Sequence, residues 1–145
     1  MIVKETKDMS EIKSIIFHPT IHPHIEDDDN KVVDLPVKDS KYIGCYIGNN
    51  IVGVGMFHKI EGVTVCHMHL LKEYRKSIGL EFGLKAIKLR PADILYTNVD
   101  ETFPNIMKYV EALGFKLIDT VKQCIKKDGL LYDSNVYKLD FSEVK

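Results

Sequence analysis

The residues best suited to chemistry gather between positions 63 and 90, where a strand-like run is followed by the start of a helix-like run. Arg75, Lys76 and Ser77 stand at the predicted first turn of that helix, and Lys72 lies just before it. The first N–H groups of a helix have no partner within the helix and carry a partial positive charge, so they attract phosphate. The pattern predicts a phosphate-binding turn, and solvated surface lysines are the alternative interpretation.

Two histidines, His67 and His69, precede this turn and lie on one face of the predicted strand, because side chains alternate along a strand. A histidine with the ordinary pKa of about 6.5 accepts a proton near neutral pH, so His67 is a candidate general base. In the alternative interpretation, one ring caps buried polar backbone and the other lines a partly filled cleft. His58 across the hairpin could join them at a metal, but no carboxylate or cysteine is spaced to complete the site, so we predict no metal.

The other reactive side chains point to no site. Cys45, Cys66 and Cys124 are odd in number and lack C-x-x-C spacing, which indicates reduced thiols in a cytosolic protein. The first two fall inside predicted strands, where a buried thiol is inert. The acidic run from Glu26 to Asp29 lacks the glycine and the terminal glutamate of a calcium loop, so we expect a solvated loop.

The composition is that of an ordinary globular protein, with 145 residues, 45% hydrophobic, 28% charged and a net charge of -1. The length predicts a single domain over residues 1–145. The absence of a basic excess argues against binding nucleic acid in bulk. The first five residues do not resemble a signal peptide, and no run approaches the roughly 20 apolar residues of a membrane helix. We therefore expect a soluble, cytoplasmic protein with no membrane partner.

The elements that must position these residues follow from hydrophobic period and turn signals. We expect, in chain order, a strand at Ile2–Glu5, a short helix capped by Asp8 or Ser10, one helical turn at Ile21–Ile25, strands at Tyr42–Ile47, Ile51–Ile60 and Val63–Leu71, a helix at Arg75–Arg90, a strand at Ile94–Val99, a helix at Asn105–Leu113, and strands at Phe115–Ile125 and Leu131–Phe141. The strand–helix–strand piece should be parallel and right-handed. The fold class is thus α/β, with a mixed and mostly antiparallel sheet, one central parallel strand pair and flanking helices.

The same periods predict which side chains face inward. The inward sets are Ile12, Ile15 and Ile16 in the first helix, Ile78, Phe82, Ala86 and Leu89 in the second, and Ile106, Val110 and Leu113 in the third. Val52, Val54, Met56 and His58 should share one side of their strand, and Glu81 and Lys85 should pair on the solvent side of their helix. Turns are expected at residues 48–50, 61–62 and 127–129.

The run from Leu71 to Arg75, the helix and strand after it, and the later segment Glu111–Phe115 resemble the GNAT (Gcn5-related N-acetyltransferase) superfamily. The resemblance implies a GNAT-like acyl-CoA N-acyltransferase fold, with acetyl-CoA as co-substrate and no metal. It implies acetyl transfer to an unidentified amine on a small molecule or a protein. The residues that it assigns to the cofactor are Met68, His69, Leu70, Leu71, Arg75, Lys76, Ser77, Ile78, Gly79, Leu80 and Asn105.

The phosphate-binding turn departs from the family pattern Arg-x-x-Gly-x-Gly/Ala. Alignment on Arg75 places Ile78 and Leu80 where the family has small residues, and Gly79 falls between them. Glycine lets the backbone approach the pyrophosphate closely, so two aliphatic side chains would narrow the cradle.

The helix before Gly114 departs as well. The family often has a tyrosine there that protonates the leaving thiolate, and the matching position is Val110. Tyr109 lies one residue away and is the candidate acid, while Asn105 lies two residues from the asparagine position at Phe103. One residue corresponds to about 100° around a helix.

The segment His18-Pro19, Ile21, Ile25, the acidic residues after it and His67 resemble a divergent GNAT branch common in bacteriophage genomes. The alternative function is a catalytically decayed GNAT-fold bacteriophage protein that serves as a binding or virion structural component. Its partners would be phage proteins or further copies of the chain, in the host cytoplasm or in the virion.

Overall fold

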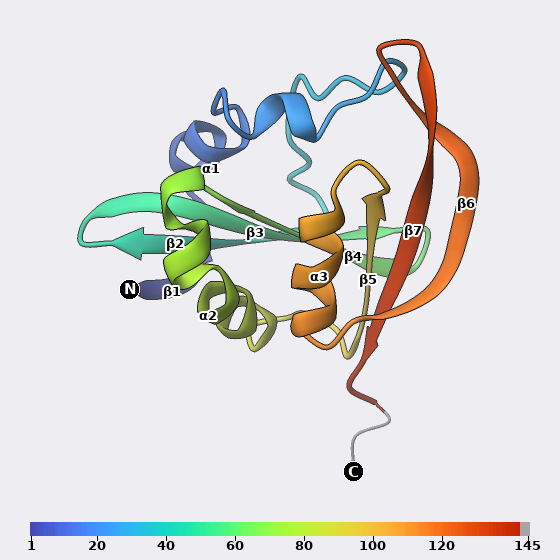
Figure 1. Cartoon of the computed structure of the whole chain (residues 1–145). Coiled ribbons are helices and arrows are strands. Elements are labelled where there is room, and N and C mark those ends of the chain that lie inside the picture. The colour runs from blue at the N-terminus through green and yellow to red at the C-terminus, as the bar shows by residue number, and fades with distance from the viewer. Residues whose placement is uncertain (143–145) are drawn as a thin grey trace.

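The computed structural model describes residues 1–142, and within them the strands form one seven-stranded sheet flanked by helices (Figure 1). The elements are β1 (Ile2–Thr6), α1 (Met9–Ile16), the 3-10 turn η1 (His22–His24), β2 (Ser40–Ile47), β3 (Asn50–Ile60), β4 (Val63–Leu70), the 3-10 turn η2 (Lys72–Tyr74), α2 (Arg75–Ile87), β5 (Ile94–Asp100), α3 (Pro104–Ala112), β6 (Lys116–Lys127) and β7 (Leu130–Asp140). The strand order is β1-β2-β3-β4-β5-β7-β6. Only the β4–β5 pair in this sheet is parallel, so the predicted fold class is confirmed.

Local signals set the first helix and the tight turns. The Asp8 carboxylate accepts the N–H groups of Ser10 and Glu11 at 3.0 and 3.2 Å, so α1 begins where the cap predicts. The β6–β7 turn has Asp128 at φ 51° and Gly129 at φ 79°, and two left-handed residues in succession produce the type I′ turn that suits the twist of a hairpin.

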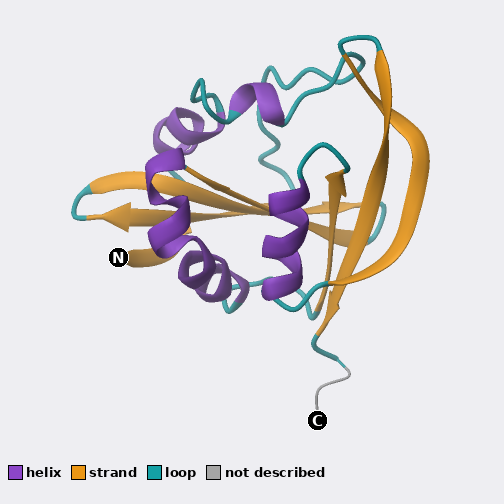
Figure 2. Cartoon of the chain, viewed as in Figure 1, coloured by secondary structure: helices purple, strands orange, loops and turns teal. Residues whose placement is uncertain are grey.

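The helices cover both faces of the sheet, as Figure 2 shows. α2 and α3 pack on one face over a buried cluster that includes Ile43, Cys66, Phe82 and Tyr137, and we name this the α2–α3 core. α1 packs on the other face, where Ile12, Ile15, Ile16, Val54 and Met56 form a second cluster. Because α1 covers only the part near β3, no helix within residues 1–142 covers the second face over β5 and β7.

Two side-chain predictions and one helix boundary are wrong in detail. Val52 joins the α2–α3 core, away from Val54, because the β2–β3 register shifts at Cys45/Tyr46 and breaks the alternation. α2 ends at Ile87, three residues before the predicted end. Ile106 is 43% exposed.

The misplacement of Ile106 has a geometric cause. Phe103, Met107 and Val110 also follow a helical period, and the structure turns this stripe toward the α2–α3 core. Since each residue advances by about 100° around the helix, Ile106 is then directed to solvent.

None of the helices formed by residues 1–142 has the length and apolar character needed to cross a membrane.

Candidate functional site

Strands β4 and β5 part soon after they begin. Their paired residues are Thr64 with Leu95 and Val65 with Tyr96. Beyond these, β4 continues to Leu70 with β3 as its partner, and β5 continues to Asp100 with β7 as its partner. The second half of β4 therefore presents one main-chain edge to a gap in the sheet.

The main-chain groups that face this gap follow from the pairing of β4 with β3. The N–H of Leu71 donates to Val52 O at 2.9 Å, so the groups of Leu71 point toward β3. Because these groups alternate in an antiparallel pair, those of Met68 and Leu70 point to the opposite side, toward the gap. The Leu70 carbonyl accepts the Nε–H of Arg75 at 2.9 Å. The N–H of Leu70 and both groups of Met68 remain for a ligand.

Helix α2 starts directly beside the end of β4, with no side-chain cap at its first turn. The N–H groups of Tyr74 and Arg75 bond within the preceding 3-10 turn. The next two N–H groups, of Lys76 and Ser77, have no acceptor four residues back within the helix. The start of α2 thus combines two free donors with the positive end of a helix dipole.

Three cationic side chains, of Lys72, Arg75 and Lys76, surround this turn. Arg75 uses its Nε for the Leu70 carbonyl, which leaves both Nη groups for an anion. Lys72 and Lys76 are exposed. Ile78 packs against the α2–α3 core, and Leu80 is 46% exposed. Ile78 is thus held by the core, and Leu80 is about half exposed.

Three histidines line the opposite face of β3 and β4. The ring centroids of His58 and His67 are 5.5 Å apart, and those of His67 and His69 are 6.3 Å apart with the rings stacked. By register this face continues across β5 through Tyr96 and Asp100, on the part of the sheet that carries no helix. Within residues 1–142, no group of three histidine, cysteine, aspartate or glutamate side chains is placed to hold a metal ion.

The histidines are far less basic than the sequence suggests. Burial, with smaller effects of His69 and His58, lowers the pKa of His67 to about 3. Burial and the nearby charge of Arg75 lower the pKa of His69 to about 4. The pKa of His67 thus lies below the ordinary value of about 6.5 because the surrounding chain withdraws the ring from water. Both rings are neutral at pH 7 and can accept hydrogen bonds.

Tyr109 comes from α3 and reaches α2. Its hydroxyl donates to Gly79 O at 2.7 Å, and burial raises its pKa well above the ordinary value. Val110, at the position of the family's tyrosine, is buried in the α2–α3 core. Asn105 lies exposed in the first turn of α3. Of the two α3 residues predicted for the site, Tyr109 is the one joined to α2 by a hydrogen bond.

The loop between α1 and β2 crosses to the β6–β7 turn, a contact the sequence did not reveal (Figure 1). The Asp28 carboxylate accepts the N–H groups of Asp128 and Gly129, both at 3.0 Å. These hydrogen bonds lower the pKa of Asp28, with the Gly129 bond as the largest cause. No local pattern indicates a contact between residues about 100 positions apart, so the sequence predicts only a solvated loop.

The same crossing is supported at the end of β5. Lys127 Nζ lies 2.8 Å from the Asp100 carboxylate and 4.3 Å from the centroid of the Phe103 ring. The His24 ring meets Phe103 edge-on at 5.5 Å between centroids. The loop and the hairpin therefore form one wall beside the sheet face that carries no helix.

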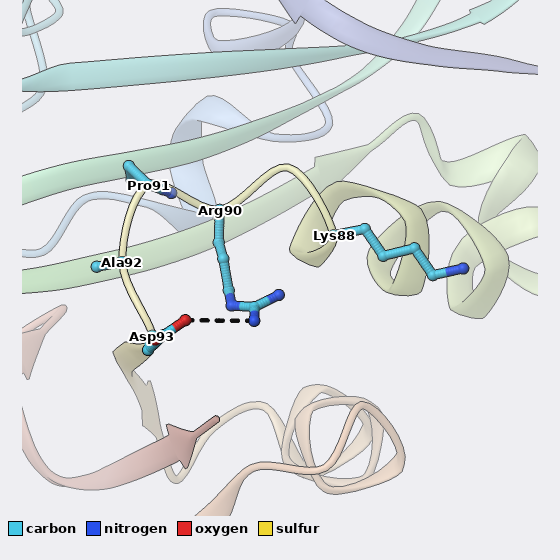
Figure 3. Close-up of a pocket in the computed structure, with 5 residues that line it drawn as sticks. All are labelled: Lys88, Arg90, Pro91, Ala92 and Asp93. Atoms are coloured by element: carbon cyan, nitrogen blue, oxygen red, sulfur yellow. Dashed lines mark hydrogen bonds and ion pairs between the residues drawn. The ribbon is translucent and has the colours of Figure 1, made fainter. Parts of the chain in front are cut away.

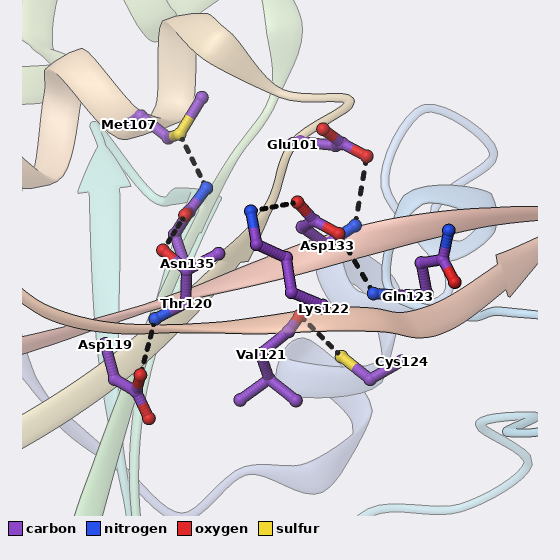
Figure 4. A network of polar contacts seen from close by, with 10 residues as sticks. All are labelled: Glu101, Met107, Asp119, Thr120, Val121, Lys122, Gln123, Cys124, Asp133 and Asn135. Carbon is purple, nitrogen blue, oxygen red and sulfur yellow. Dashed lines mark hydrogen bonds and ion pairs between the residues drawn. The ribbon is translucent and has the colours of Figure 1, made fainter.

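Hairpin β6–β7 is held in shape by a polar network (Figure 4). The Asp133 carboxylate accepts from Lys122 Nζ at 3.2 Å and from the main-chain N–H of Gln123 at 2.9 Å, where the β6–β7 register shifts. Asn135 contacts Thr120 at 2.9 Å and donates to the sulfur of Met107 in α3 at 3.1 Å. The wall is thereby tied to α3.

Two surface cavities lie elsewhere, near the end of α2 that is remote from its first turn. One, of about 320 Å³, is lined by residues 88 and 90–93, and Figure 3 shows Arg90 paired with Asp93 there. The other, of about 430 Å³, includes Lys59 and Thr64 of the β3–β4 hairpin. Arg90 stacks on Phe141 at 3.6 Å, which suits a structural role.

Comparison with known proteins assigns the fold. No protein-family model matches the chain, and no curated protein matches its sequence. Its structure is similar to an N-acetyltransferase from Staphylococcus aureus Mu50, with 17% identity, a TM-score of 0.74 and 98% of each chain covered. It is similar to a putative phosphinothricin N-acetyltransferase, with 16% identity, a TM-score of 0.79 and 98% and 99% of the two chains covered.

A third similar structure is a Bacillus subtilis acetyltransferase in complex with CoA, with 15% identity, a TM-score of 0.72 and 95% and 97% of the two chains covered. At these identities the likeness establishes the fold. The chain has the GNAT N-acyltransferase fold, as its sequence predicts.

Proposed function

We propose that this protein transfers an acyl group from an acyl-CoA, acetyl-CoA in the simplest case, to an amine on a small molecule or a protein. The observation that carries the proposal is the parting of β4 from β5 directly beside the uncapped start of α2. The three similar structures described above are an N-acetyltransferase, a putative phosphinothricin N-acetyltransferase and an acetyltransferase in complex with CoA.

The residues present fit such a cofactor. An extended amide-containing arm needs main-chain partners, and Met68 and the N–H of Leu70 offer them along the gap. A pyrophosphate needs donors and positive charge, and the N–H groups of Lys76 and Ser77 with the Nη groups of Arg75 offer both. His69, Leu71 and the residues up to Leu80 would form the surroundings of these contacts.

Acetyl-CoA would supply the acyl group as an activated thioester. The amine nitrogen would form a bond to the acyl carbon while the C–S bond breaks, and CoA would leave as a thiolate that takes its proton from water. We propose that the neutral His67 ring accepts a hydrogen bond from the attacking amine or from a water beside it. With a pKa of about 3 the ring keeps its lone pair at physiological pH, but it holds a transferred proton weakly, so the proton passes on to water. Main-chain N–H groups on the gap side of β4 would stabilise negative charge on the acyl oxygen.

A second candidate function is a catalytically decayed GNAT-fold bacteriophage protein that acts by binding or as part of a virion. The low pKa of His67 and the buried Val110 at the tyrosine position favour it. The bacteriophage origin, phage protein or homo-oligomeric partners and a location in the host cytoplasm or the virion belong to this proposal.

Titration of the purified protein with acetyl-CoA in a calorimeter tests the proposed function. Lys76→Glu reverses a charge beside the start of α2. The loss of favourable interaction between this end of the helix and the phosphates, roughly 1.4 kcal/mol, should raise the Kd for acetyl-CoA about ten-fold. Lys88→Glu makes the same charge change at the exposed other end of α2 and should leave binding unchanged. Absence of saturable binding at millimolar acetyl-CoA would reject the enzyme.

An amine panel with detection of released thiol then separates the two functions. Turnover that falls in His67→Gln, with acetyl-CoA binding retained, supports catalysis. Binding without turnover of any amine supports the decayed protein.

A further inference from the structure

Tyr109 is placed to hold α2 by a polar contact in an otherwise apolar interface. Its hydroxyl donates to Gly79 O at 2.7 Å, in the second turn of α2. A carbonyl oxygen has two lone pairs, so Gly79 can accept from Tyr109 and from its own helix together. The hydroxyl lies between α2 and the sheet, where burial keeps it protonated.

One of the two nearby glycines of α2, Gly83, makes room for this tyrosine. A Cβ built at Gly83 would overlap the Tyr109 hydroxyl and lie 2.7 Å from Leu113 Cδ2. A Cβ at Gly79 would lie 3.9 Å from the Tyr109 ring. The ring therefore enters a notch in the side of α2 that a residue larger than glycine at position 83 would fill.

A second side-chain hydrogen bond joins the start of α2 to another element. The Nε–H of Arg75 donates to Leu70 O at 2.9 Å and fixes the first residue of α2 to the end of β4. The two uncapped N–H groups, of Lys76 and Ser77, lie between these two contacts in the sequence. Both contacts act on the turn whose donors would receive the phosphates.

We propose that Tyr109 is a positioning residue that fixes the start of α2 against β4, in place of the acid role that the resemblance suggests. This inference rests on the proposed function for its effect on acyl-CoA, and on the α2–α3 contact alone for its structural part. A hydroxyl that donates to a main-chain carbonyl has its proton directed at α2 and away from a leaving group.

The size of the effect follows from a two-state view of the helix start. Loss of one neutral hydrogen bond, ~1 kcal/mol, changes the ratio of docked to undocked helix starts about five-fold. Here the docked form is the one in which the start of α2 is held against β4, and we take it as the form that binds acyl-CoA. Once the docked form is no longer the main population, the apparent Kd rises by up to about the same factor.

Amide hydrogen exchange on the ligand-free protein tests the docking. Tyr109→Phe should speed exchange about five-fold at residues 78–83. Tyr137→Phe is the matched control, because Tyr137 donates to Glu111 of α3 at 3.4 Å and is not bonded to α2. Equal exchange at residues 78–83 in the two variants would overturn the inference.

Kinetics and CoA binding test the consequence. Tyr109→Phe should raise the KM for acetyl-CoA and the Kd for CoA up to five-fold, with kcat and its pH profile unchanged. A fall in kcat with unchanged KM would show an acid and would also overturn the inference. If the wild-type protein binds no CoA, the proposed function fails, and hydrogen exchange still decides whether Tyr109 docks α2.

Discussion

The two glycines of α2 that face α3 should respond in opposite directions to the same substitution. Gly79 and Gly83 are both buried in the helix and lie one turn apart. Replacement by alanine stabilises a helix by about 0.5–1 kcal/mol when the new methyl group has space, because glycine loses more backbone freedom on folding. The space around each glycine therefore decides the sign.

At Gly79 the nearest atoms to an added Cβ are at 3.9 Å and 4.0 Å, which is ordinary van der Waals contact. Gly79→Ala should stabilise the protein by about 0.5–1 kcal/mol. At Gly83 the Cβ would overlap the Tyr109 hydroxyl, and Leu113, on its other side, is only 7% exposed. Overpacking of this kind costs about 1–3 kcal/mol, and the gain in helix propensity from glycine to alanine offsets part of that cost. Gly83→Ala should therefore lower the free energy of unfolding by about 1–2 kcal/mol.

Urea unfolding of the wild type and both variants, followed by circular dichroism, measures the difference. We expect the midpoints to fall in the order Gly79→Ala, wild type, Gly83→Ala, with about 2 kcal/mol between the two variants. A Gly83→Ala protein as stable as Gly79→Ala would show that the Tyr109 ring does not occupy this notch, and it would refute the packing argument for α2 and α3.

Three further outcomes can be checked by simple measurements. Val110→Ala should cost about 2 kcal/mol and Ile106→Ala under about 0.5 kcal/mol in urea unfolding, and a larger loss at Ile106 would contradict its exposure. The pKa of His67 is lower in the folded protein than in the unfolded chain, so between pH 7 and pH 5 only the unfolded chain gains this proton. The free energy of unfolding should therefore decrease by up to about 2 kcal/mol from this group as the pH falls from 7 to 5. The same pH dependence of stability in His67→Gln would refute this expectation. Asp28→Ala should speed amide exchange at the β6–β7 turn, whereas Asp29→Ala should not, and equal rates in the two variants would contradict the contact.

The elements that local rules specify agree with the sequence-based predictions. Asp8 caps α1, the Asp128–Gly129 pair makes the last hairpin turn, and the run from Val63 to Val99 forms the parallel crossover. Each of these depends on residues near one another in the chain, through capping, φ preference or the handedness of a crossover.

The features that the predictions miss have a different origin. Phe103, Met107 and Val110 compete with a stripe through Ile106, and only contact with the sheet chooses between them. The low pKa of His67 depends on how closely the chain surrounds the ring. The contact of Asp28 with the β6–β7 turn joins segments about 100 residues apart.

The sequence by itself determined where strands, helices and tight turns form, and it placed cations and a glycine at the start of α2. The tertiary structure decided which groups there are available: it parted β4 from β5, gave the Nε of Arg75 to Leu70 and brought the Tyr109 hydroxyl to Gly79. Hydrophobic period and turn preference are local properties of the chain. Desolvation and long-range hydrogen bonds exist only once distant segments pack together.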